Sequence, residues 1–441
     1  MELVILLAVI IFIIIATVRL KMHPVFSLTL AAVASGFFFG VMPGEIVGIM
    51  SDGFGKTLSS IGLVIAFGTI IGVFLEKTGA TQVLANSILK VIGLKRSPLA
   101  LNLAGFVISI PVFCDSGFVI LSSLNETLSK KTNIPKLVFA VALATGLYAA
   151  HVFIPPTPGP LAAAAIVEAD LGMVMLLGFL VALPVSLTGY FWSRYIGKSL
   201  RESEVSQKET NAVHDVDQNN VSSSMAFLPL LVPIFLIAMK SIAEYPTHPL
   251  GTTWFFNTIT FVGEPIMALL IGVFFAFPLA KGKTSEERNT WIVDALKQAG
   301  SIVLITGAGG AFGAILRTLD IAAILNLSSS SQYGGLLICF GIAAVLKTAQ
   351  GSSTVAIITT AAIVAPLLET FGLHTTVEKA LAVLAVGAGA MTVSHINDSY
   401  FWVVSQFSNM DMKNALKGHT VATLFQGTVA ISLILLLNAL F

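Results

Sequence analysis

Charged residues are scarce in this chain of 441 amino acids. Asp, Glu, Lys and Arg make up 11% of it, whereas soluble domains carry about 25%. The 24 basic residues nearly balance the 23 acidic ones, which argues against a polyanionic partner such as nucleic acid. The hydrophobic share of 56% excludes a disordered chain. Together these proportions indicate a polytopic membrane protein.

Cysteine is also rare, and several enzyme motifs are missing. Cys114 and Cys339 both lie in apolar stretches, which predicts neither a disulfide framework nor a thiolate metal site. The GFGKT segment at 53–57 has Met50 where a phosphate-binding loop requires glycine. We therefore expect no metal, no cofactor, no use of ATP and no enzymatic activity.

Long apolar segments dominate the chain. A membrane helix needs about 20 largely apolar residues, and candidate segments lie at about 3–18, 24–43, 60–76, 99–125, 137–169, 171–193, 225–243, 254–280, 300–316, 321–368, 380–404 and 420–441. Amphipathic stretches, which we expect at the membrane surface, lie at Gly44–Ser59, Thr81–Val91 and Trp291–Ala299. The glycine-rich run at 307–313 predicts close helix packing through Gly309 and Gly313.

Two of the apolar segments are interrupted by polar residues. Residues 99–125 contain Pro111 and Asp115, and residues 321–368 contain Lys347. Irregular backbone at membrane depth must be buried by protein or line a water-filled cavity, and a re-entrant hairpin meets that requirement. With the N-terminus outside, two hairpins satisfy the positive-inside rule for all basic residues except Lys56, Lys240, Arg317, Lys347 and Lys379.

The two halves of the chain then repeat one order of elements. Residues 1–196 contain a hairpin at about 99–125, residues 223–441 contain one at about 332–368, and the polar stretch 197–222 links the halves. Five crossings per half invert the second half relative to the first, as in many secondary transporters. The predicted fold is all-α and polytopic, with about ten transmembrane helices plus two re-entrant hairpins in an inverted repeat.

Each predicted hairpin carries a polar tip. The first tip is Asp115-Ser116-Gly117, where the carboxylate is either functional or a helix N-cap. The second is Gln350-Gly351-Ser352-Ser353-Thr354, where hydroxyls and helix N–H groups suit a carboxylate ligand. Lys347 lies nearby, and it either steers the anion or extends to the external interface.

Two more helices are predicted to break inside the membrane. The prolines at 155–160 cannot all be helical, so the chain unwinds there and frees carbonyls and Thr157. His151 precedes this break and is either a packing or a functional residue. The second break, at 394–402, supplies acceptors for substrate hydroxyls from His395, Asn397 and Asp398. The candidates for carrying a coupled proton are Asp115, Asp398, His395 and His151.

These motifs resemble the gluconate permease (GntP) family of proton symporters, within the wider ion-transporter superfamily. The resemblance spans essentially the whole chain and rests on 115–119, 155–160, 350–354 and 395–398. It implies uptake of a small hydroxylated carboxylate, such as gluconate or a related sugar acid, together with protons across the inner membrane. The superfamily further implies an elevator movement of a hairpin-bearing domain against the scaffold of a homodimer.

Alternatives to this interpretation concern the ligand and the coupling ion. Asp115 stands where some family members have Glu, and other relatives transport glycerate or D-serine, so either is an alternative substrate. Sodium is an alternative to protons, because unwound carbonyls around Thr157 also suit a cation. A sensor that binds its ligand without accumulating it is the alternative from another functional class.

Overall fold

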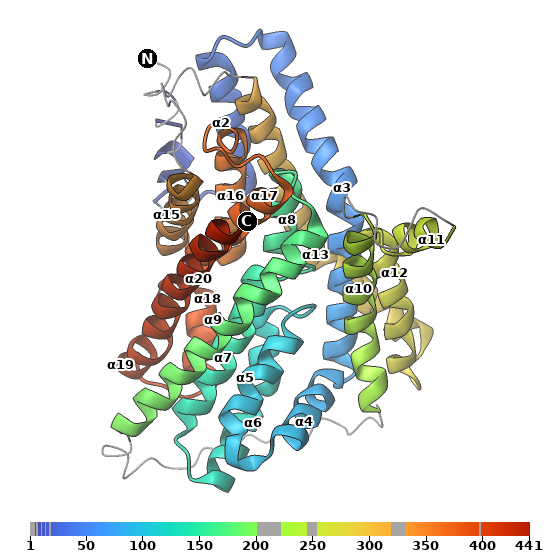
Figure 1. Ribbon diagram of the computed structural model, residues 1–441, viewed down its shortest axis with the longest axis vertical. Coiled ribbons are helices and arrows are strands. Elements are labelled where there is room, and N and C mark those ends of the chain that lie inside the picture. Colours follow the sequence, from blue (N-terminus) through green and yellow to red (C-terminus); the bar gives the residue numbers. More distant parts are fainter. Residues whose placement is uncertain are drawn as a thin grey trace.

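The protein is all-helical over the residues whose structure is described. The computed structural model describes residues 19–200, 222–244, 254–318 and 332–441 without Asn397, and single positions between 5 and 16. No strand occurs within these ranges, and Figure 1 shows the helices in an elongated arrangement.

Several helices begin at a proline, which is favoured in the first turn because its missing N–H group would have no partner there. The helices before residue 201 are α2 (Pro24–Phe38), α3 (Pro43–Lys77), α4 (Ala80–Ile92), η1 (Leu94–Arg96), α5 (Ser97–Ile108), α6 (Cys114–Thr132), α7 (Lys136–Phe153), α8 (Pro158–Ile166) and α9 (Leu171–Leu200). Those after it are α10 (Ser223–Ala243), α11 (Trp254–Val262), α12 (Pro265–Ala276), η2 (Phe277–Ala280), α13 (Ser285–Arg317), α15 (Gln332–Gln350), α16 (Ser353–Val364), η3 (Ala365–Leu367), α17 (Thr376–Met391), α18 (Ser399–Phe407), α19 (Met412–Ala415), the π-helical turn η4 (Leu416–Thr420) and α20 (Val421–Leu440).

Several helices are long and apolar enough to cross a membrane. Within the described residues there are six such helical runs, or up to nine if three bent pairs each count as one span. The bent pairs are Pro43–Ser60 with Gly62–Lys77, Ala80–Ile92 with Leu94–Ile108, and Trp254–Val262 with Pro265–Ala280. The first apolar segment, 3–18, is described only at single positions. The count of ten spans therefore stays a prediction.

Two segments expected to lie at the membrane surface are instead parts of longer helices. Gly44–Ser59 continues into the next apolar segment as α3, which bends by 43°. Trp291–Ala299 continues into 300–316 as α13. Neither junction contains a proline, and Gly62 and Gly300, which lie at the two junctions, both stay helical. Thr81–Val91, in contrast, lies within the separate helix α4, which meets the following helical run at 108°.

Helices α3 and α13 pack closely through small residues. A Cβ atom at Gly310 would lie 2.1 Å from Thr57 Oγ1, and one at Gly53 would lie 2.6 Å from the Gly310 carbonyl oxygen. A Cβ at Gly313 would lie 3.8 Å from its nearest neighbour. The run does pack closely, but the predicted pair Gly309 and Gly313 does not make the contact with α3. A Cβ at Gly309 would lie 3.3 Å from Ile166 Cδ1, and Gly310 makes the closest approach to α3 instead. The sequence could not distinguish these faces, because every glycine in the run 307–313 is equally small.

Helix α7 forms the centre of the molecule. Every residue from Leu137 to Phe153 is buried, because α5, α6, α9 and α17 all pack against α7. The chain breaks after α7 and resumes as α8, and it breaks in the same way between α17 and α18. Helix α16 packs on α8, and α6 packs on α18. Each helix that follows a predicted hairpin tip therefore contacts the helix that follows a break in the other half.

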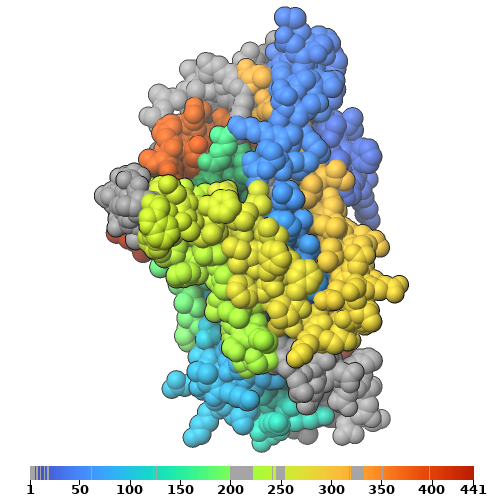
Figure 2. Space-filling model, turned by 90° about the vertical axis from the view of Figure 1, so that its right-hand side faces the viewer, coloured from blue at the N-terminus to red at the C-terminus, as the bar shows by residue number. Residues whose placement is uncertain are grey.

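A second group of helices lies beside this centre. Helix α3 packs on α12 and α13, and α10 packs on α12. In Figure 1 α10, α11 and α12 lie on the right, and Figure 2 faces them, with α10 in yellow-green and α12 in yellow. Their outward side is apolar, with Phe235 and Phe274 63% and 64% exposed. Such a surface is typical of helices that contact lipid.

Candidate functional site

The tip between α15 and α16 is shaped by one glycine and one serine. Gly351 has φ of +83°, a conformation that glycine adopts without the steric cost of a side chain. Ser352 then caps α16, with its hydroxyl accepting a hydrogen bond from Val355 N at 3.3 Å. Lys347, in the last turn of α15, donates from Nζ to the Gly351 carbonyl at 2.7 Å. The cation thereby stabilises the negative end of its own helix.

The break between α17 and α18 presents a carboxylate at the start of a helix. Helix α17 ends at Met391, and Val393 in the break has φ of +56°. Asp398 is the N-cap of α18, with Oδ1 accepting a hydrogen bond from Tyr400 N at 3.1 Å. A carboxylate at this position satisfies a free N–H group and interacts favourably with the helix dipole.

Lys347 and Asp398 form a buried ion pair between these two turns. Lys347 Nζ lies 2.5 Å from Asp398 Oδ2, and the two residues are 1% and 3% exposed. Lys347 therefore does not extend to the interface, which excludes that alternative in the described conformation. Removing a charge from water is costly unless it is paired and hydrogen-bonded. The Gly351 carbonyl and the Asp398 carboxylate together provide that compensation.

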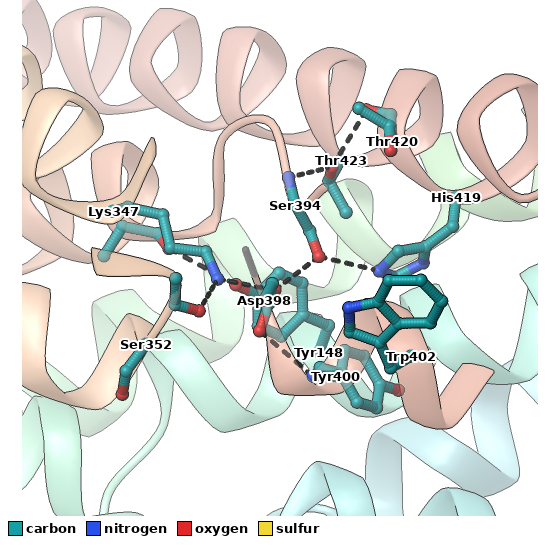
Figure 3. Close-up of polar contacts among 12 residues, drawn as sticks. Tyr148, Lys347, Ser352, Ser394, Asp398, Tyr400, Trp402, His419, Thr420 and Thr423 are labelled. Atoms are coloured by element: carbon teal, nitrogen blue, oxygen red, sulfur yellow. Dashed lines mark hydrogen bonds and ion pairs between the residues drawn. The ribbon is translucent and has the colours of Figure 1, made fainter. Parts of the chain in front are cut away.

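A hydrogen-bonded chain continues from the carboxylate towards η4 (Figure 3). Ser394 Oγ donates to Asp398 Oδ2, and His419 Nε2 lies 3.0 Å from the same hydroxyl. Thr423 Oγ1 accepts a hydrogen bond from Ser394 N at 2.9 Å, which holds the broken segment against α20. The polar order is thus Lys347, Asp398, Ser394 and His419, and all four residues are buried.

Aromatic rings enclose this polar chain. Lys347 Nζ lies 5.8 Å from the centre of the Tyr148 ring, within the range of a cation–π interaction. The Tyr148 and Tyr400 ring centroids are 5.2 Å apart, and Tyr400 lies 5.4 Å from His419. Tyr400 also donates from its hydroxyl to the Ala144 carbonyl at 2.9 Å. The aromatic side chains join α7, α18 and η4 around the ion pair.

Two predicted residues of the other half, Asp115 and Thr157, lie at the corresponding helix starts, whereas His151 lies in the last turn of α7. Asp115 is in the first turn of α6, and its Oδ1 has no hydrogen-bond partner among the described residues. Thr157 is buried and donates to the Ile154 carbonyl at 2.5 Å. His151 is buried beside Phe113, with ring centroids 6.0 Å apart, and its Nδ1 likewise has no partner within the described part of the chain. None of these three takes part in the hydrogen-bonded chain around Asp398.

The remaining predicted residues have different surroundings. Gly117 is packed, since a Cβ there would lie 2.7 Å from Leu147 Cδ2. Ser353 is buried. Those that are partly exposed are Ser116, Thr354 and His395. Asn397 and the side chain of Gln350 lie outside the described part of the structure.

Sequence reasoning missed the residues that complete the polar chain and its enclosure. Ser394 lies in the predicted break, but serine is too common at helix ends to stand out. His419 follows Lys417 at the edge of an apolar segment, a position typical of a surface residue, yet it is fully buried. Tyr148 had no local signal, because a tyrosine in an apolar helix is ordinarily a packing residue.

Two cavities adjoin the turn between α8 and α9. Their volumes are about 510 and 400 Å³, and both are lined by Ser60, Ala165 and Glu168. Lys56 Nζ lies 2.7 Å from Glu168 Oε1 and connects α3 to this turn. Neither cavity is lined by Lys347 or Asp398, so the ion pair is closed off from both.

The sequence model of one protein family, described as GntP family permease, matches residues 1–440 of this chain. The chain belongs to the GntP permease family. The family and its relatives are permeases rather than enzymes. With several helices long enough to cross a bilayer, this GntP-family chain is a multi-pass protein of the inner membrane.

Relatives in this family transport more than one kind of ligand. The high-affinity gluconate transporter of Escherichia coli is 34% identical, covering 95% of this chain and 94% of its own length. The gluconate permease of Pseudomonas aeruginosa is 32% identical, covering 98% and 96%. The D-serine transporter DsdX of Escherichia coli is 31% identical, covering 96% and 95%.

A solved transporter structure shares the fold. The YdaH transporter of Alcanivorax borkumensis superposes with a TM-score of 0.59, covering 91% of this chain and 90% of its own, at 16% identity. At that identity the likeness concerns the arrangement of helices alone. The overall helical arrangement of this GntP-family permease therefore occurs in other transporters as well.

Proposed function

We propose that this permease is a proton-coupled symporter that takes up a small hydroxylated carboxylate, such as gluconate or a related sugar acid. The names of the gluconate relatives support the ligand class. The observation that carries the coupling is the buried pair of Lys347 with Asp398. An anion entering this region meets an ammonium group that already has a counter-ion.

Charge balance then links the anion to a proton. With Lys347 and Asp398 both ionised, the buried pair is neutral. A substrate carboxylate replaces Asp398 as the partner of Lys347 only if Asp398 becomes protonated, because two carboxylates facing one ammonium leave an uncompensated buried charge. One anion therefore enters with one proton. Ser394 and His419 form the route from Asp398 towards η4 along which that proton is exchanged.

Protons are favoured over sodium by the position of the ammonium group. A carbonyl and a carboxylate oxygen converge on Lys347 Nζ, and such oxygens are also ligands of a hard cation. The resident ammonium occupies that position and neutralises the carboxylate without an added ion. Asp115, His151 and His395 are the proposed carriers of any further proton.

The proposed binding residues are the polar groups at the two tips and the two breaks. Gly351 and the first turn of α16 offer N–H groups and hydroxyls to the carboxylate, and polar side chains at the other three positions face the substrate hydroxyls. The full proposed set is Asp115, Ser116, Gly117, Thr157, Gln350, Gly351, Ser352, Ser353, Thr354, His395, Asn397 and Asp398, with Lys347 as the group that attracts the anion.

The proposed architecture is an inverted repeat of five spans and one re-entrant hairpin per half. The matching contacts of α16 with α8 and of α6 with α18 support it, as do those of α2 with α13 and of α12 with α3. We further propose that the helices around α7 and α17 move together, as an elevator, against a dimeric scaffold that contains α3, α10, α12 and α13.

Transport in liposomes tests this proposal. A dye trapped in the lumen should report acidification during gluconate uptake, and uptake at fixed pH should not depend on sodium. Asp398→Asn should abolish the acidification but preserve gluconate exchange, since Lys347 then binds the anion without a proton. Sodium-dependent uptake, or acidification that survives in Asp398→Asn, contradicts it. Survival in Asp115→Asn as well passes the proton to His151 and His395.

D-serine is the alternative ligand, favoured by the relative that transports it. D-serine carries an ammonium group as well as a carboxylate. Its own ammonium group balances the carboxylate, so D-serine depends less on Lys347 as a counter-ion than gluconate does. Thermal-shift titrations with gluconate, glycerate and D-serine compare these ligands directly. Stabilisation by D-serine alone, in the absence of any effect of gluconate, assigns the permease to the alternative substrate.

A further inference from the structure

A basic groove lies where α12 ends and α13 begins, far along the chain from the proposed transport site. Its volume is about 720 Å³. One wall is apolar and the other carries three cations, Lys281, Lys283 and Arg288, and no acidic residue is among the residues that line it. The groove plays no part in the function proposed above.

The local fold fixes where these cations lie. Helix α12 passes into η2, and the turn that follows is closed by hydrogen bonds from Lys281 N to the Pro278 carbonyl at 3.2 Å and from Lys283 N to the Ala280 carbonyl at 3.1 Å. Thr284 then caps α13 in a capping box with Glu287. The sharp turn and the capped start bring the lysines next to Arg288, which is one turn into the new helix.

The charges near the groove leave a net positive surface. Glu287 accepts a hydrogen bond from Thr284 N at 2.8 Å, so its carboxylate is directed towards the helix cap. Lys283 Nζ lies 3.7 Å from Glu287 Oε1. At that distance Glu287 compensates only part of the positive charge of Lys283. Lys281 is exposed, and Arg288 donates to its own first turn, to Ser285 Oγ at 3.2 Å. Glu286 and Glu287 both lie in the first turn of α13, but neither lines the groove. The three cations outnumber these two carboxylates and favour an anionic ligand.

The apolar wall identifies which kind of anion fits. Met225 and Phe274 line the groove and are 48% and 64% exposed. They lie on α10 and α12, which face the viewer in Figure 2. The outward side of α10 is apolar beyond the groove as well, with Leu231 50% and Phe235 63% exposed. A soluble anion gains nothing from this surface. A lipid gains from both walls, because its phosphate meets the cations while an acyl chain covers the aromatic and methionine side chains.

We propose that this groove binds an anionic phospholipid of the surrounding membrane. The phosphate is held by Lys281, Lys283 and Arg288, and one acyl chain lies along Phe274 and Met225. The lipid bridges the end of α12 and the start of α13 and so stabilises the corner between them. Zwitterionic lipids bind less well, because their own cationic group is repelled by the three basic side chains.

Lipid titrations of the purified full-length chain in a mild detergent test this proposal. Phosphatidylglycerol should raise the unfolding temperature and remain bound in native mass spectra, and phosphatidylcholine should do neither. The triple variant Lys281→Gln/Lys283→Gln/Arg288→Gln should weaken the apparent affinity for phosphatidylglycerol by at least about tenfold, as expected for losing several basic residues at an anionic surface. Phe274→Ser should weaken it while leaving all three cations in place.

A matched control removes the same charge elsewhere. Lys90, Lys95 and Arg96 are exposed around the α4–η1 turn, and their triple replacement by Gln should leave the affinity unchanged. An equal loss in this control indicates general attraction to a basic protein and overturns the proposal. It is also overturned if inorganic phosphate stabilises the protein as well as the lipid does, or if the two lipids act alike. Lys281→Gln alone provides the same comparison should the triple variant fold poorly.

Discussion

Lys347 and Asp398 hold two separate turns of the chain together through an ion pair of 2.5 Å that is almost completely buried. Lys347 lies in the last turn of the helix before a predicted hairpin tip, and Asp398 is the N-cap of the helix after a break. Each charge also stabilises the end of its own helix, the cation at a C-terminus and the anion at an N-terminus. The pair therefore supports the local structure of both turns as well as the contact between them.

The buried pair should be far more important for stability than an exposed one. Lys347→Gln or Asp398→Asn alone leaves an uncompensated buried charge and should cost about 3–5 kcal/mol, whereas the double variant should lose less than the sum of the two. Thermal unfolding in detergent measures this. As a control, Lys240→Gln should cost under about 1 kcal/mol, because its partner Glu264 is 49% exposed at the side chain. Additive losses at Lys347 and Asp398 speak against direct coupling.

The start of α16 should contribute to anion binding. Ser352→Ala and Ser353→Ala should each weaken gluconate binding by about 1–3 kcal/mol if each hydroxyl donates to the carboxylate. Thr359→Val, two turns further along the same helix, is the control, since Thr359 is fully buried. Equilibrium binding by calorimetry gives the values. Wild-type affinity in both serine variants places the anion elsewhere.

If the helices move as proposed, the ion pair between Lys56 and Glu168 should separate during each transport cycle. Lys56 lies on α3 and Glu168 follows α8, so the two residues lie in groups of helices that shift relative to each other. Cysteines at both positions, joined by a short bismaleimide in a background without Cys114 and Cys339, should block uptake. The same cross-link between positions 240 and 264 joins α10 to the residue that caps α12, within the scaffold, and should leave uptake intact. Full uptake with 56 and 168 cross-linked rules out relative movement of these two groups.

Two glycines of α13 should respond in opposite ways to alanine. Gly310→Ala places a Cβ 2.1 Å from Thr57 Oγ1 and 2.8 Å from the Gly53 carbonyl, so we expect a loss of about 1–3 kcal/mol from overpacking. Gly300 has open space around the same position, and Gly300→Ala should stabilise the helix by about 0.5–1 kcal/mol. Thermal unfolding of both variants tests the pair, and equal effects contradict the close approach of α3 to α13.

The sequence by itself determined the class of protein and the local events along the chain. Its apolar composition required a membrane, because so few charges cannot cover a soluble surface of this size. The prolines at 155–160 and the polar residues around Gly351 and Asp398 marked where helices end, since proline and N-capping residues act on their own backbone. Such signals need no knowledge of distant parts of the chain.

Only the tertiary structure decided which of these polar groups meet. A lysine near the end of an apolar helix satisfies its charge equally well in water or against a carboxylate, and the packing of α15 against α17 selected Asp398. His419 became a buried neighbour of Ser394 because η4 packs against α7 and α9. Gly310 rather than Gly313 met α3 because the crossing of the two helices, and not the glycine run itself, determines the face in contact.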